Sequence, residues 1–130
     1  MKRIKQVILI RKDLKMRRGK EIAQGSHAAM EFIVDQLRES FQNNTDHTVK
    51  LNEKEMRWIQ EGMAKVCLQV NSEEELVAHY EKAKSLGLKS FLIKDSGRTE
   101  FGGVPTLTVC AIGPDEVEQI DVVTSDLKLY

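Results

Sequence analysis

Residues 6–29 read QVILIRKDLKMRRGKEIAQGSHAA, an apolar run followed by a basic turn and the start of a helix. The apolar run is β-branched and bounded by charges, which is typical of a strand buried on both faces of a parallel sheet. Beyond the turn, apolar residues recur at steps of three and four, which predicts one long helix over residues 19–41. We expect the sheet-facing row of this helix to be Ile22, Ser26, Met30, Ile33, Leu37 and Phe41.

The rest of the chain continues the alternation of strands and helices. Further strands are predicted at residues 66–70, 91–93 and 106–112, and helices at residues 52–61, 72–86 and 115–120. The linker 96–105 is too short for a parallel crossover, so we expect the fourth strand to run antiparallel to its neighbour. The sequence therefore predicts one domain over residues 1–130, a three-layer α/β/α fold with a four-stranded mixed sheet.

The chain has 20 basic and 20 acidic residues, but these charges are unevenly distributed. Residues 11–20 hold six basic residues and one acid, a local charge of +5, which leaves −5 for the other 120 residues. Such a focus attracts polyanions even when the net charge is zero. The first partner to consider is the backbone of a nucleic acid.

Several classes of protein are disfavoured by composition. No apolar run approaches the roughly 20 residues that cross a bilayer, and no export signal is recognisable, so we expect a cytoplasmic protein without a membrane segment. Cys67 and Cys110 lie in apolar runs and lack the spacing of a zinc site, so we expect two buried thiols. Motifs for nucleoside triphosphates and dinucleotides are also missing.

Two polar loops follow predicted strands at the same edge of the sheet. Residues 11–20 follow the first strand and residues 95–105 follow the third. Ligands of open α/β sheets bind at the carboxyl ends of the strands, so this edge is where we expect a site.

On the long helix, Lys20, Gln24 and His27 share one side because they are spaced i, i+4 and i+7. Helix geometry alone favours a boundary row in which Gln24 and His27 satisfy local hydrogen bonds. In the second loop, Asp95 could act as a base or orient a lysine, and Arg98 could bind a phosphate.

Short motifs spread over nearly the whole chain carry a family resemblance. They are RKDLKM (11–16) with Gly19-Lys20, AQGSHAA (23–29), SEEEL (72–76), Asp95 with Gly97-Arg98-Thr99, AIGP (111–114) and LKL (127–129). As an ordered set they resemble the type 2 peptidyl-tRNA hydrolase family. Gly25, Ser96 and Glu100 depart from the archaeal and eukaryotic pattern of that family, so we expect a bacterial or phage-like branch.

The resemblance implies hydrolysis of the ester that joins a peptide, or an N-blocked amino acid, to the 3′-terminal ribose of tRNA, without a cofactor or a metal. The residues that would surround the ester are Lys20, Gln24, Asp95 and Thr99, with His27 in support. The residues that would bind tRNA phosphates are Lys12, Lys15, Arg17, Arg18 and Arg98. The expected partner is peptidyl-tRNA, and the resemblance also allows a homodimer.

The roles within this site remain open at the level of sequence. Lys20 would supply positive charge to the developing oxyanion or orient the attacking water, and Asp95 would hold Lys20 or act as the base. Two other classes of function compete with hydrolysis. One is a non-catalytic RNA-binding module on the same fold, and the other is an adaptor that binds proteins through the acidic helix near residues 114–121.

Overall fold

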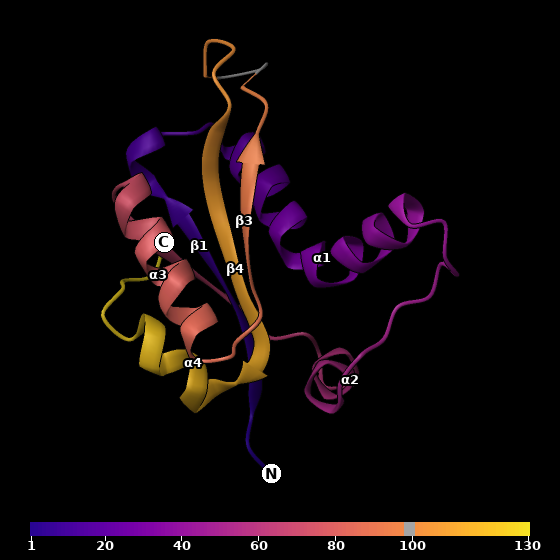
Figure 1. The fold of residues 1–130 in the computed structure, drawn as a ribbon. Coiled ribbons are helices and arrows are strands. Elements are labelled where there is room, and N and C mark those ends of the chain that lie inside the picture. Colours follow the sequence, from indigo (N-terminus) through magenta and orange to yellow (C-terminus); the bar gives the residue numbers. More distant parts are fainter. Residues whose placement is uncertain (98–100) are drawn as a thin grey trace.

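The computed structural model describes residues 1–97 and 101–130, and Figure 1 shows the course of the chain. Within these residues the sheet has four strands in the order β2-β1-β4-β3. Their bounds are β1 Ile4–Arg11, β2 Lys65–Val70, β3 Ser90–Asp95 and β4 Thr106–Glu116. Strand β1 pairs in parallel with β2, whereas β4 runs antiparallel to both β1 and β3. The prediction of a mixed sheet with an antiparallel fourth strand is confirmed.

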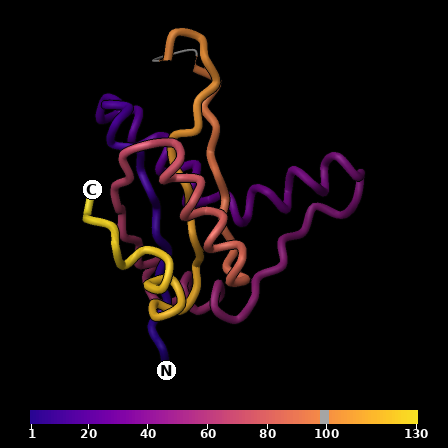
Figure 2. The backbone as a smooth tube through the Cα atoms, turned by 60° about the vertical axis from the view of Figure 1, so that its left-hand side comes forward, coloured from indigo at the N-terminus to yellow at the C-terminus, as the bar shows by residue number. Residues whose placement is uncertain are grey.

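Helices cover both faces of the sheet, which makes the three layers that the sequence predicted. They are α1 Arg18–Gln42, α2 Glu53–Gln60, α3 Glu73–Ser85 and α4 Val117–Thr124, and a single 3₁₀ turn, Lys12–Leu14, precedes α1. Helices α3 and α4 pack on one face, while α1 and α2 lie on the other (Figure 1). The C-terminal part of α1 and the linker after it extend away from the sheet in both views (Figures 1 and 2).

The predicted inward row of α1 is wrong for most of its members, although the helix itself is confirmed and Ile33 packs against a buried cluster. Ile22, Met30 and Phe41 are 64%, 57% and 59% exposed, and Ser26 is also exposed. The buried residues of α1 are instead Gln24, Ala28, Glu31, Phe32 and Ser40. A row that combines small and polar residues lies against the sheet, so apolar spacing alone pointed to the opposite side of the helix.

The open edge of β2 is covered by the C-terminal segment of the chain. Gln69 donates its backbone N–H to Lys128, and Tyr130 donates to the carbonyl of Cys67, both at about 3 Å. The Tyr130 hydroxyl also donates to the Glu21 carboxylate near the start of α1. The expectation of two buried thiols holds only in part, because Cys110 is buried whereas Cys67, on this edge, is exposed.

Candidate active site

The basic loop between β1 and α1 is fixed at its base and exposed at its tip. The Arg11 guanidinium donates to the Asp13 carboxylate and to the carbonyl of Leu107, which ties the loop to β4. Met16 is buried under the loop, and Lys15 adopts a left-handed conformation with φ of 51°. The basic residues left exposed on this loop are Lys12, Lys15, Arg17 and Arg18. The loop therefore presents four cations at the carboxyl end of β1.

An ion pair joins the two loops that were expected to meet. Lys20 stands in the first turn of α1, and Asp95 is the last residue of β3. The Lys20 Nζ lies 2.7 Å from Asp95 Oδ1, and the two side chains are only 14% and 11% exposed. The pair is thus largely withdrawn from water although it lies beside an exposed basic loop.

Gln24 lies at the centre of this arrangement and not at its margin. Its side-chain amide nitrogen points to Asp95 Oδ1 at 3.4 Å, and its carbonyl oxygen accepts a hydrogen bond from the hydroxyl of Thr108 on β4. Because that hydroxyl donates to the amide oxygen, the NH₂ group of Gln24 is turned toward the carboxylate. Thr108 is fully buried and therefore acts as a positioning residue for Gln24.

The second oxygen of Asp95 is held by the loop that follows it. The backbone N–H of Gly97 donates to Asp95 Oδ2 at 2.8 Å. Gly97 has φ of +83°, and a Cβ atom there would lie 2.2 Å from the backbone oxygen of Val104, so only glycine fits. The hydrogen bond from Lys20 lowers the pKa of Asp95 below its ordinary value, and the Gly97 N–H and the charges of Lys20 and His27 act in the same direction, against the effect of burial. The carboxylate is therefore ionised at neutral pH.

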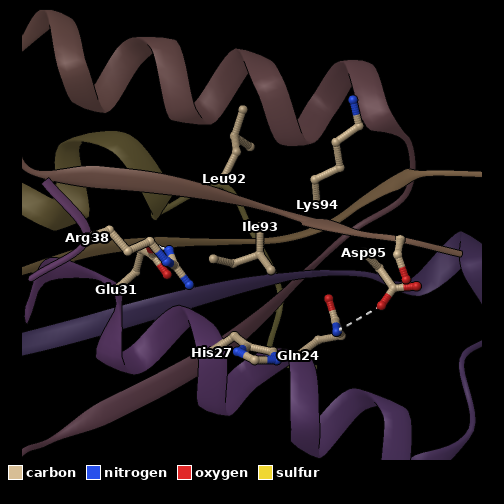
Figure 3. Close-up of a pocket in the computed structure, with 9 residues that line it drawn as sticks. Gln24, His27, Glu31, Arg38, Leu92, Ile93, Lys94 and Asp95 are labelled. Atoms are coloured by element: carbon tan, nitrogen blue, oxygen red, sulfur yellow. Dashed lines mark hydrogen bonds and ion pairs between the residues drawn. The ribbon is translucent and has the colours of Figure 1, made fainter. Parts of the chain in front are cut away.

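A cavity of about 320 Å³ opens beside Asp95 and runs between α1 and β3. Figure 3 shows Gln24 and His27 at its Asp95 end and Glu31 with Arg38 farther along α1. Arg38 donates to the Glu31 carboxylate, which is 12% exposed. The geometry offers an ordered ammonium, an amide and an imidazole at the mouth of a polar cavity.

The structure brings together most, but not all, of the residues that the sequence singled out. Lys20 and Gln24 both contact Asp95, and His27 lines the cavity beside Gln24. Thr99 and Arg98 lie outside the described residues. Thr108 was missed by sequence reasoning. Its only signal is a hydroxyl directly before the apolar run VCAI (109–112), and threonine is common in strands.

Residues 1–97 and 101–130 contain neither a cluster of metal-ligand side chains nor a membrane-spanning helix. In that part of the chain, no three His, Cys, Asp or Glu side chains gather closely enough to hold a metal ion. Nor does any helix there have the length and apolar character needed to span a membrane.

Comparison with known proteins gives consistent relatives over the whole chain. Residues 4–130 match the family model described as peptidyl-tRNA hydrolase PTH2. The chain is 41% identical to the peptidyl-tRNA hydrolase of Methanocaldococcus jannaschii and 38% identical to that of Methanothermobacter thermautotrophicus, with 97% of this chain and 99% of each relative covered. It is also 42% identical to a probable peptidyl-tRNA hydrolase 2 of Dictyostelium discoideum, over 97% of this chain and 54% of the relative.

These relatives correct one expectation. The named homologues are archaeal and eukaryotic, so the predicted bacterial or phage-like branch is not supported. Two of the three residues behind that prediction lie in the described part of the chain. Gly25 is half-buried on α1 and Ser96 is exposed, whereas Glu100 lies outside the described residues.

Proposed function

This chain belongs to the peptidyl-tRNA hydrolase PTH2 family, and we propose that it cleaves the peptide–tRNA ester at the Lys20–Asp95 pair. The chain has peptidyl-tRNA hydrolase activity by its membership of this family. The observation that carries the site assignment is the 2.7 Å ion pair, which lies between the exposed basic loop and the cavity. Hydrolysis of an ester needs an activated water and a positive group near the developing oxyanion.

We assign the positive group to Lys20. Its ammonium is held by a carboxylate at the mouth of the cavity, so it is oriented before substrate arrives. Asp95 is assigned to holding this ammonium and not to a general acid, because its lowered pKa keeps the carboxylate ionised. The reaction proposed here uses no metal and no cofactor, since the electrophilic role falls to Lys20.

Gln24 and His27 are assigned to the ester and the attacking water. The NH₂ group of Gln24 already points toward Asp95, and a water that hydrogen-bonds to both groups would be a neighbour of the reacting carbonyl. His27 lines the cavity one helical turn farther on and supports this arrangement. On the family resemblance alone, we propose that Thr99 also forms a hydrogen bond with the ester or the water.

The exposed basic loop is proposed to bind the phosphates of the tRNA acceptor end. Four of the cations assigned to this role are Lys12, Lys15, Arg17 and Arg18, and the fifth, on the resemblance alone, is Arg98. Contacts of this kind release counterions, so affinity for tRNA should fall steeply with salt. We place the activity in the cytoplasm, where translation produces peptidyl-tRNA.

We also propose that two copies of the chain associate. The outward side of α1 carries Ile22, Met30 and Phe41, all more than half exposed. An apolar row on a helix that faces solvent is a common feature of a homodimer interface. Equilibrium sedimentation of the wild type and of Met30→Glu tests this, and a monomer at micromolar concentration in the wild type would contradict it.

The central experiment measures release of an N-acetylated amino acid from its tRNA by purified protein in EDTA. Lys20→Ala and Asp95→Asn should each lower kcat/KM by about 100- to 1,000-fold, because an oriented charge in a low-dielectric site is lost. The matched control is the Lys5–Asp121 pair, which has the same 2.7 Å distance and a lysine side chain that is 16% exposed. Lys5→Ala should retain wild-type kcat/KM.

The outcomes separate the competing functions. Full activity in both Lys20→Ala and Asp95→Asn would overturn the site assignment. Binding of tRNA without hydrolysis by the wild type, on several tRNAs, would indicate the non-catalytic RNA-binding module. Loss of hydrolysis by the wild type in EDTA, with recovery on adding a divalent cation, would overturn the metal-free reaction.

A further inference from the structure

The cavity beside the active site lies along the open edge of β3. It is lined by the consecutive residues 92–96 of β3 and its end, and by Gln24, His27, Glu31 and Arg38 of α1. A cavity on one face of a sheet touches every second residue of a strand, because successive side chains point to opposite faces. Contact with consecutive residues therefore places this cavity, here called the edge trough, at the rim of the strand.

The trough is lined in part by the main chain of β3. Figure 3 shows the side chains of Leu92 and Lys94 pointing away from α1, although both residues line the trough. Strand β3 ends the strand order, and among the described residues it pairs with β4 alone. An edge strand presents a row of peptide groups able to pair with another extended chain.

The hydrogen bonds to β4 indicate which peptide groups remain open. Gly113 of β4 donates its N–H to the carbonyl of Lys89, and Phe91, two residues farther on, pairs with Ala111 of β4. Successive residues of a strand direct their N–H and C=O groups to opposite edges. The peptide groups of Ser90 and Leu92 therefore face away from β4, and those of Leu92 face the trough.

The position of the ester relative to the trough indicates which part of the substrate binds there. The exposed basic residues lie in the loop before α1 and at its first residue. Lys20 and Gln24 follow along α1, and Glu31 with Arg38 marks the far end of the trough. The ester is the junction between tRNA and peptide, so with tRNA on the basic loop the peptide extends into the trough. At that far end the Arg38 guanidinium is paired with the Glu31 carboxylate, so the cation there is already neutralised by a protein group and is not set aside for a phosphate.

We propose that the peptide moiety of the substrate binds as an added strand along the edge of β3, an inference that rests on the proposed function. The C-terminal ester lies at Asp95, at the carboxyl end of β3, so the peptide runs parallel to this strand. From Gln24 to Glu31 the helix rises about 10 Å, and to Arg38 about 21 Å. At about 3.3 Å per extended residue, the trough accommodates about three to six residues of peptide.

The first test varies the substrate and leaves the protein unchanged. Peptidyl-tRNAs that carry one to eight residues should show kcat/KM rising about tenfold up to about five residues and then levelling, because each main-chain hydrogen bond adds a small net gain. N-methylation of single peptide bonds should lower kcat/KM about three- to tenfold at every second position and leave the intervening positions unchanged. This alternation is the signature of strand pairing.

The second test alters the far end of the trough. Glu31→Ala/Arg38→Ala should reduce the ratio of kcat/KM for a six-residue peptide to that for a one-residue substrate. A ratio measured within one protein sample cancels any loss of folded enzyme. The matched control, Arg57→Ala/Glu61→Ala, removes an Arg–Glu ion pair of α2 and should keep the wild-type ratio.

Each outcome bears on the inference. A kcat/KM independent of peptide length, or equal sensitivity to N-methylation at every position, would overturn strand addition by the peptide. Hydrolysis of the shortest substrate in the same experiment would leave the proposed function intact. If the 3′ end of the tRNA occupied the trough, the double variant would lower kcat/KM for all substrates by one factor, which also overturns it. Absence of hydrolysis with every substrate would instead contradict the proposed function.

Discussion

The two faces of the sheet bury different kinds of side chain. Beneath α3 and α4 most buried residues are apolar, among them Leu9, Leu76 and Ile120. Beneath α1 the buried residues include Gln24 and Glu31, and Thr108 contributes a hydroxyl from β4. Apolar burial stabilises the fold directly, whereas a buried polar group costs free energy unless it is hydrogen-bonded.

This difference indicates that the two faces of the sheet have different roles. The α3 side supplies most of the well-packed core, and the α1 side keeps polar groups at fixed positions around Asp95. Almost every such group on the α1 side has a partner, although Gln6 Oε1 is a buried oxygen without one in the described residues. Departures from a purely apolar interior are expected at functional sites, and Gln24, Glu31 and Thr108 lie together beneath α1.

The largest effect on stability should come from truncating a buried apolar side chain of α3. Leu76→Ala removes a fully buried side chain and should lower the free energy of unfolding by about 2–5 kcal/mol. The kcat/KM per folded molecule should stay at the wild-type value, because Leu76 is on the face away from the site. Urea denaturation and kinetics on the same samples measure both; a parallel fall in kcat/KM would show that the two faces are coupled.

A smaller effect should follow from one hydroxyl on the polar side. Thr108→Val keeps the volume but frees the Gln24 amide to rotate, so kcat should fall about tenfold while KM changes little. Thr124→Val is the matched control, since Thr124 is also buried and donates its hydroxyl within α4. Equal loss of activity in both variants would mean that Thr108 acts through general stability.

A smaller effect is expected on the salt dependence of tRNA binding when single surface charges are removed from the basic loop but not from α3. Lys15→Gln and Arg18→Gln on the basic loop should each reduce the slope of log K against log salt for tRNA binding by about one unit. Lys82→Gln, an exposed change on α3, should leave the slope unchanged. Fluorescence titration at several salt concentrations measures the slopes, and identical slopes for all three variants would contradict a tRNA site on the loop.

The smallest effect concerns pH. The pKa of Asp95 lies below its ordinary value near 3.8, so the carboxylate should remain ionised throughout pH 5–8. A lowered pKa in the folded state means that the ion pair stabilises the protein above the unfolded pKa and that this contribution is lost as pH falls through the folded value. Carboxyl ¹³C NMR should show the pKa of Asp95 rising in Lys20→Ala. An unchanged pKa would mean that Lys20 is not the main cause of the lowered pKa of Asp95.

Much of the fold could be predicted from local patterns. The apolar run after Lys5, the i, i+4 spacing of α1 and the short 96–105 linker led to the correct elements and to an antiparallel β4. The meeting of Lys20 with Asp95 was also expected, because parallel strands β1 and β3 end at the same edge of the sheet. These inferences need only the period of a segment and the composition of its loops.

The packing of α1 could not be obtained in this way. Spacing marked Ile22, Met30 and Phe41 as inward because it counts apolar residues without knowing what lies opposite them. In the folded protein the sheet meets Gln24, Ala28 and Phe32 instead. The small Ala28 allows α1 to approach the sheet, and Gln24 gains a partner there that no local pattern contains.

Sequence alone established the order of the elements, the basic loop at the start of α1 and the family resemblance, because each depends on residues that are neighbours along the chain or ordered along it. Tertiary structure alone determined the inward side of α1, the link from Thr108 through Gln24 to Asp95, and the edge trough along β3. Those features join residues separated by more than 60 positions in the chain. Their geometry follows from how the helix packs on the sheet, which periodicity and composition do not specify.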